Sequence, residues 1–297
     1  MNIYWPVFKN LENEFSRLMY DIHIDDNQLT VYSSKIADLI LRGAVETESI
    51  AKELYYKNGG TKTGHIRYDD DALDYLITKW KLDQKTVIIS SPNCFLTNKT
   101  ILPFLKNEQR TGKTYNTFSW NNSYQNIKHD RGKSITFGNI KYLFDILAAL
   151  YVLNLYYLES VFPLEKDSKG TSLSPGLGSD VFSIAIFSYR GHNGQGVYQK
   201  AEEFDKCIYY IDQTEETAKI FNESLKTFQG KINELAFKNP KVTEYLRTAQ
   251  IPQLKSNWLW DALGQESYIS TLRQAQNLAP LKTEQIKYEA KLNTNAI

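Results

Sequence analysis

The chain is poor in the residues that cross-link small folds or bind metals. Its 297 residues include only 2 cysteines, Cys94 and Cys207, and 4 histidines. Two cysteines far apart in the sequence exclude a disulfide framework and a zinc knuckle. The chain also lacks HExxH and G-x-S-x-G, so neither zinc-hydrolase nor serine-hydrolase chemistry is indicated. We expect no metal and no cofactor, and the scarcity of cysteine favours the reducing cytoplasm.

A large net charge is missing too. The sequence has 35 Lys and Arg against 34 Asp and Glu, which gives a formal charge of +1. This balance excludes a strongly basic surface field, so a nucleic acid would have to be bound by a local patch of cations. Aromatic residues are plentiful by contrast, with 20 Tyr, 14 Phe and 5 Trp. Most of these rings are expected to fill the core and interfaces.

Long apolar runs are also absent. The longest, residues 143–158, spans about 16 residues and is interrupted by Asp145 and Asn154, whereas a membrane span needs about 20. This run therefore predicts a buried helix and no membrane partner. The N-terminal residues lack the uninterrupted apolar core of a signal peptide, which again favours the cytoplasm.

Helical periodicity dominates what the sequence does contain. Apolar residues three and four apart predict helices over seven stretches: 6–20, 29–57, 70–81, 138–160, 214–237, 240–249 and 258–277. Extended structure is predicted at 86–90 and in 181–189. Residues 197–211 could then return as a second strand or start a helix at Gln199. Thr30 or Ser33 can cap the start of the helix 29–57.

The order of these elements predicts a mainly α fold. We expect a helical bundle over residues 1–162 and a Ser-, Gly- and Pro-rich loop or linker over 163–180. A mostly helical region over 181–297, with room for one short β-hairpin, follows. The polar tail from Leu281 onwards is expected to fray.

Gly43 lies inside the helix predicted over 29–57. Glycine is costlier there than alanine, which close approach of another helix would explain. A second glycine-rich segment, Gly191–Gly196, lacks the spacing of a phosphate-binding loop, so a turn is predicted.

The segment Trp120–Arg131, WNNSYQNIKHDR, concentrates polar side chains in one predicted helix. At 3.6 residues per turn, Asn122, Asn126 and His129 share one face together with Gln125. Trp120, Tyr124 and Ile127 fall on another face, where they can anchor the helix to the core. This polar face is the best place in the sequence for a functional site.

His129 is the first candidate for chemistry on this face. An imidazole titrates near neutral pH, so it can accept a proton from a hydroxyl and pass one to a leaving group. Lys128 and Arg131 beside it can hold a phosphate, and Asn122 and Asn126 can donate hydrogen bonds to the same anion. Together these groups would suit metal-free cleavage of RNA. The alternative is a helix end whose cations complement the helix dipole.

The same residues carry a family resemblance. WNNSYQNIKHDR, followed by the apolar helix 138–160 and preceded by the helix that contains 36–53, resembles the helix pair of bacterial HEPN-type domains. The resemblance spans about residues 5–160. It implies a helical bundle that dimerises. It further implies, for active members of the family, a metal-independent ribonuclease of toxin–antitoxin, CRISPR or anti-phage systems.

The chain departs from that family at one position of its motif. The family's nuclease motif is an arginine followed, after four to six residues, by a histidine, and His129 matches the histidine. Asn122, Ser123 and Tyr124 stand where the arginine is expected. Arg131 or Arg42 could supply the guanidinium in space. For Arg42 the plainer alternative is a surface ion pair with Glu46, four residues later on the same helix.

We therefore predict a HEPN-like effector of a bacterial anti-phage or toxin–antitoxin system, a metal-independent endoribonuclease that works as a homodimer. One alternative is a non-catalytic HEPN-like adaptor or sensor that binds a partner protein or a nucleotide, and another is a structural subunit of a larger complex. In the first reading His129 and Arg131 are catalytic. The residues expected to hold the RNA are Lys128, Asn122, Asn126 and Arg42.

Overall fold

Helices make up most of the fold in the computed structural model, which describes residues 2–164, 177–188, 190–192, 198–248, 258–283 and 286–295. The predicted mainly α class with a small β part is confirmed. The chain divides into two compact units, Met1–Asp212 with Ala290–Ile297, and Gln213–Glu289. These units do not coincide with the predicted ranges 1–162 and 181–297. Most of the predicted linker, residues 165–176, lies outside the described residues.

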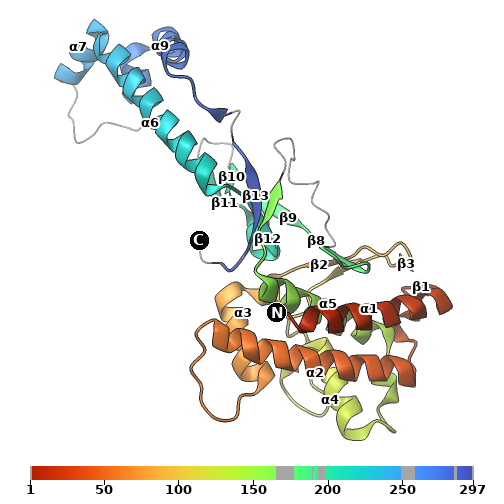
Figure 1. Ribbon diagram of the computed structural model, residues 1–297. Coiled ribbons are helices and arrows are strands. Elements are labelled where there is room, and N and C mark those ends of the chain that lie inside the picture. The colour runs from red at the N-terminus through yellow and green to blue at the C-terminus, as the bar shows by residue number, and fades with distance from the viewer. Residues whose placement is uncertain are drawn as a thin grey trace. The chain divides into compact units, whose positions relative to one another are not determined.

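The N-terminal unit is built around a bundle of helices (Figure 1). These are α1 (Tyr4–Asp21), α2 (Ser34–Lys57), α3 (Asp74–Trp80), α4 (Ser119–Asp130) and α5 (Ile140–Leu158). α5 contacts α1, α2 and α4, and most of its side chains are buried. Gly43 of α2 lies where a Cβ would come within 3.2 Å of Ile146 of α5. The predicted close approach of a second helix at this glycine is therefore confirmed.

α5 is long and apolar enough to cross a membrane by length and composition alone. Most of it is buried among the other helices of the unit, so it is the core helix of a folded bundle. Asn139 caps its start, where the side chain accepts a hydrogen bond from the backbone of Tyr142. Ser33 caps α2 in the same way through Ile36, as predicted. Both caps satisfy backbone N–H groups that a helix start leaves unpaired.

The helix predicted over 70–81 has an irregular beginning. A π-helical turn, η2 (Tyr68–Leu73), leads into α3. Asp71 Oδ2 accepts a hydrogen bond from the backbone N–H of Arg67 at 2.8 Å, which fixes the start of the turn. π-turns of this kind are frequent at functional sites because they redirect neighbouring side chains.

Short strands supply the β part. β2 (Val87–Ile89) pairs antiparallel with β4 (Thr100–Ile101) and with β8 (Phe182–Ile184). A second sheet has the order β7 (Phe162–Leu164), β13 (Tyr288–Leu292), β12 (Tyr209–Gln213), β9 (Ile186–Ser188). β10 (Arg190–His192) and β11 (Tyr198–Lys200) form an antiparallel pair, with residues 193–197 outside the described part. The remaining pairs join β1 (Ile24–Asp25) to β3 (Cys94–Phe95) and β5 (Glu108–Gln109) to β6 (Asn116–Thr117).

The frayed tail expected from Leu281 onwards is wrong, because β13 inserts between β7 and β12. Its backbone finds partners far away in sequence, which a polar composition does not reveal. Cys94 and Cys207 are both buried and free, in agreement with the absence of a disulfide framework.

The second unit consists of α6 (Glu215–Phe237), α7 (Pro240–Thr248), α8 (Trp258–Leu263) and α9 (Gln265–Leu278). The helix predicted over 258–277 is broken between α8 and α9 at Gly264, which adopts a positive φ of 72°. The buried apolar cluster of this unit is small and comprises Ala236, Val242 and Leu263.

Candidate functional site

Helix α4 is anchored to the core by its aromatic face. Trp120 is fully buried, stacks on Phe118 with ring centroids 5.4 Å apart, and donates a hydrogen bond from Nε1 to the carbonyl of Pro103 at 2.9 Å. Tyr124 and Ile127 are buried on the same face. The predicted anchors therefore pack the helix against the core.

Asn122 and Asn126 hold a neighbouring hairpin. Asn122 is buried; its Oδ1 accepts hydrogen bonds from the backbone N–H and the hydroxyl of Thr111, at 2.9 and 3.1 Å. Its Nδ2 donates to Glu108 Oε1 at 2.8 Å. Asn126 Nδ2 donates to Thr111 Oγ1 at 3.1 Å and to the Asn122 carbonyl. Both amides predicted to hold a phosphate are thus engaged within the protein.

The predicted cations and the histidine lie at the exposed end of α4. His129 is exposed in the last turn, next to Lys128, whose Nζ lies 3.2 Å from the hydroxyl of Tyr124 and over its ring. Arg131 is exposed and donates a hydrogen bond to the carbonyl of Ser34 at the start of α2, at 2.9 Å. These three side chains therefore share one end of the helix.

Arg42 does not join that group through any polar contact. It is exposed on α2, and in the part of the chain that the structure describes no hydrogen bond or ion pair links it to His129 or Arg131. The ion pair with Glu46 is likewise not formed among the described residues.

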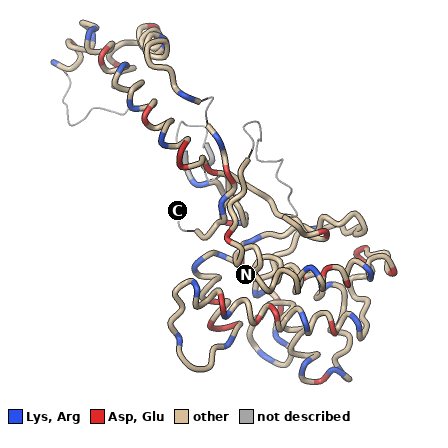
Figure 2. Tube along the Cα trace, viewed as in Figure 1, with Lys and Arg blue, Asp and Glu red and all other residues tan. Residues whose placement is uncertain are grey.

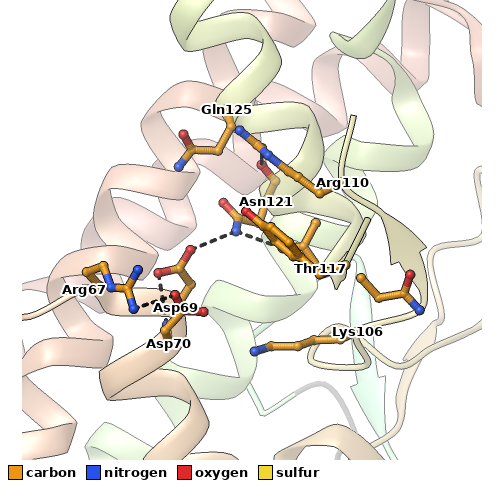
Figure 3. Close-up of a pocket in the computed structure, with 10 residues that line it drawn as sticks. Arg67, Asp69, Asp70, Lys106, Arg110, Thr117, Asn121 and Gln125 are labelled. Atoms are coloured by element: carbon orange, nitrogen blue, oxygen red, sulfur yellow. Dashed lines mark hydrogen bonds and ion pairs between the residues drawn. The ribbon is translucent and has the colours of Figure 1, made fainter. Parts of the chain in front are cut away.

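A polar pocket of about 500 Å³ lies beside α4, in the N-terminal unit (Figure 3). Three segments line it: residues 67–70 at the start of η2, residues 106–117 that contain the β5–β6 hairpin, and α4. The lining residues are Arg67, Asp69, Asp70, Lys106, Arg110, Tyr115, Asn116, Thr117, Asn121 and Gln125. The volume lies within the range of about 300–1,000 Å³ that small-molecule sites occupy.

A chain of hydrogen bonds orients the wall of the pocket that α4 forms. The buried phenol of Tyr68 donates to Asn121 Oδ1 at 2.5 Å and accepts from Gln125 Nε2 at 2.9 Å. Asn121 Nδ2 can then point only at acceptors, namely Thr117 Oγ1 at 3.0 Å and Asp69 Oδ2 at 3.3 Å. Burial, with the charge of Asp69 beside it, raises the pKa of Tyr68 far above its ordinary value. Tyr68 therefore stays protonated and serves as a fixed donor.

The three cations of the pocket differ in how far their charge is already neutralised. Arg67 forms an ion pair with Asp70 at 3.0 Å. Lys106 forms one with Asp74 at 2.7 Å and lies over the ring of Phe118. Arg110 has no carboxylate partner among the described residues.

The guanidinium of Arg110 donates to the carbonyl of Asn121 at 3.3 Å. A guanidinium carries five N–H donors, so most of those of Arg110 remain for a ligand. Arg110 is consequently the strongest anion-binding group of the pocket.

The charge around the pocket is local. The lining residues contribute three cations and two carboxylates, whereas over the rest of the unit the two signs are interspersed along the chain (Figure 2). Figure 3 shows Asp69 and Asp70 with Arg67 on one side and Lys106 on the other. Such a site suits a ligand with an anionic group and several hydroxyl or amine donors. No group of three or more metal-ligating side chains occurs within the described residues.

Sequence reasoning found the helix but missed most of the pocket. Gln125 was placed on the polar face of α4, whereas Asn121, Arg67, Lys106 and Arg110 were not singled out. The signal that could have drawn notice is the run of cations in the polar segment 106–113, which precedes the motif helix. That segment has no periodicity, so its cations could not be placed in space.

No protein-family model matches the chain, and no curated protein or solved structure matches it either. The candidate site therefore rests on its own geometry.

Proposed function

We propose that the N-terminal unit binds a ribonucleotide in the pocket beside α4, either free or as part of an RNA strand. The observation that carries this proposal is Arg110, a partly buried guanidinium that lines the pocket without a carboxylate partner among the described residues. Guanidinium groups bind phosphate through two parallel hydrogen bonds, and Lys106 adds a second positive charge nearby.

The carboxylate wall supports the ribonucleotide class. Asp69 is held by the amide of Asn121 and accepts the backbone N–H of Asp70 through its Oδ1. A carboxylate held in place accepts hydrogen bonds from neighbouring ribose hydroxyls or from the amine edge of a base. Tyr115, which is exposed at the rim, offers a ring on which a base can stack.

Binding of a fluorescently labelled single-stranded RNA and of unlabelled nucleoside monophosphates distinguishes the two forms of the ligand. Arg110→Ala is expected to weaken both by about 10- to 100-fold, because a hydrogen bond to a charged group contributes roughly 1.5–3 kcal/mol. The matched control is Arg17→Ala, which removes an exposed arginine of α1 that does not line the pocket. Equal affinity of the Arg110 variant and the wild type would exclude the pocket as the binding site.

Metal-independent cleavage of RNA is the second candidate function, and the exposure of His129 favours it. Gln125 lines the pocket, and His129 follows it one helical turn later on α4, so a strand leaving the pocket along the helix would meet the imidazole. His129 would transfer the protons, while Lys128 and Arg131 would neutralise the phosphate. Arg131 keeps donors for this role beyond the one that binds Ser34.

Incubation of labelled RNA with the protein in excess chelator tests this second function. His129→Ala should abolish cleavage and leave RNA affinity within about twofold of the wild type, because the histidine lies outside the pocket lining. Cleavage that persists in the variant would remove His129 from the mechanism. The HEPN relationship, the homodimer, the partner protein, the defence setting and the cytoplasmic location stay predictions from the sequence.

A further inference from the structure

The pocket's most available cation stands on a hairpin that has little regular structure of its own. β5 and β6 are joined by only two pairs of residues, Glu108 with Thr117 and Gln109 with Asn116. A two-stranded pair of this length is not stable in water by itself. Contacts with residues outside the hairpin must therefore fix the position of Arg110.

Those contacts are made by residues that come before and after Arg110 in the sequence. On one side, the carboxylate of Glu108 accepts hydrogen bonds from Asn122 at 2.8 Å and from the hydroxyl of Tyr142 at 2.7 Å, and it pairs with Lys141 at 3.1 Å. On the other side, Thr111 donates both its backbone N–H and its hydroxyl to Asn122. Among the residues that the structure describes, Asn122 is thus the one side chain that binds both Glu108 and Thr111.

We propose that Asn122 and Glu108 are positioning residues that set the location of Arg110 in the pocket, an inference that rests on the proposed function. Asn122 touches no ligand in this arrangement, because its amide is buried and both its oxygen and its nitrogen are hydrogen-bonded to the hairpin. The amide oxygen accepts hydrogen bonds from Thr111, and the amide nitrogen donates one to Glu108. An amide is therefore required at this position, and neither a carboxylate nor an apolar group replaces it.

Two variants of Asn122 test this role through ligand binding. Asn122→Ala is expected to weaken RNA binding about 10-fold while Arg110 is still present. Asn122→Asp keeps the acceptor for Thr111 but places a second carboxylate against Glu108. Two carboxylates at this distance repel unless they share a proton, which raises the pKa of one of them. The affinity of this variant should consequently recover, relative to the wild type, as the pH falls from 7.5 to 5.5.

Hydrogen exchange without ligand tests the same inference independently of the proposed function. The backbone N–H of Thr111 is bound by Asn122, so amides in 109–117 should exchange at least about 10-fold faster in Asn122→Ala. Gln125→Ala is the matched control on the same helix, because Gln125 binds Tyr68 and not the hairpin. Unchanged exchange in Asn122→Ala, or an Asn122→Asp variant whose affinity follows the wild type at every pH, overturns the inference.

The two proposals fail in different ways. A wild type that binds no ribonucleotide ends the proposed function, and the exchange experiment alone then decides whether Asn122 positions the hairpin. A wild type that binds RNA, together with Asn122 variants that bind it equally well, ends the positioning role and leaves the pocket intact.

Discussion

The two halves of helix α4 both carry polar side chains but have opposite surroundings. In the first half, Asn121 and Asn122 are buried and their amides are fixed by neighbours from η2 and from the β5–β6 hairpin. In the second half, Lys128 and His129 are exposed to solvent. A polar helix face therefore does two separate tasks here, which its sequence does not distinguish. The buried half builds a pocket, and the exposed half presents cations and an imidazole to solvent.

The largest effect is expected from the aromatic anchor that both halves depend on. Trp120→Ala should lower the free energy of unfolding by about 3–5 kcal/mol, since it leaves a large cavity and removes the hydrogen bond to Pro103. Urea denaturation followed by circular dichroism measures this loss. Tyr115→Ala, an exposed aromatic at the pocket rim, is the control and should cost less than about 0.5 kcal/mol.

A pH-dependent effect is expected where the buried half of α4 begins. Ser119, the first residue of α4, donates to the partly buried carboxylate of Asp145 on α5. Burial raises the pKa of Asp145 from 3.8 to about 6. The folded protein then holds this proton more tightly than the unfolded chain, so stability falls as the pH rises from about 4 to 6.

At most about 3 kcal/mol is involved, because one pKa unit corresponds to about 1.4 kcal/mol. Asp145→Asn removes the carboxyl group that titrates, so the variant is the reference against which the pH dependence of the wild type is compared. The difference in unfolding free energy between the variant and the wild type should grow in favour of the variant between pH 4 and pH 6. Two parallel curves would show that the environment of Asp145 does not penalise its charge.

A small effect is expected from the contact that ties the exposed end of α4 to α2. Arg131→Ala removes a solvent-exposed hydrogen bond to the carbonyl of Ser34. The expected loss of stability is about 0.5–1 kcal/mol, close to the net contribution of one such bond. Thermal unfolding of the variant checks the value. A loss above about 2 kcal/mol would contradict this expectation, because it would mean that contacts at the exposed end of α4 contribute to stability on the scale of those in its buried half.

The smallest effect on stability is expected from His129→Ala. The side chain is exposed, and no hydrogen bond or ion pair of its imidazole occurs within the described residues. Its removal should change the free energy of unfolding by less than about 0.5 kcal/mol. Chemical denaturation of the variant beside the wild type measures this difference, and a larger loss would contradict the exposed position of the imidazole.

The helices could be predicted from the sequence because each one is a local pattern. Trp120, Tyr124 and Ile127 recur at helical spacing, and they are buried as that spacing predicts. Gly43 pointed to a close helix contact, which Ile146 provides. The strand Tyr288–Leu292 could not be found in this way, because its partners in the sheet are far away in sequence and its own residues are largely polar.

The pocket could not be predicted from the sequence for a related reason. Arg110 becomes part of a site through Glu108 and Thr111, whose partners on α4 and α5 lie 11 to 34 residues further along the chain. No periodicity links these positions. The sequence predicts that Asn122 holds a phosphate, whereas its neighbours in space show that its amide is turned towards the hairpin.

The most direct test of the central claim compares the affinity of one labelled RNA for Arg110→Ala and for His129→Ala under the same conditions. If the buried half of α4 and its hairpin form the binding site, Arg110→Ala weakens binding by about 10- to 100-fold. In that case His129→Ala stays within about twofold of the wild type. The reverse order, with His129→Ala the weaker binder and Arg110→Ala unchanged, would move the site to the exposed end of the helix.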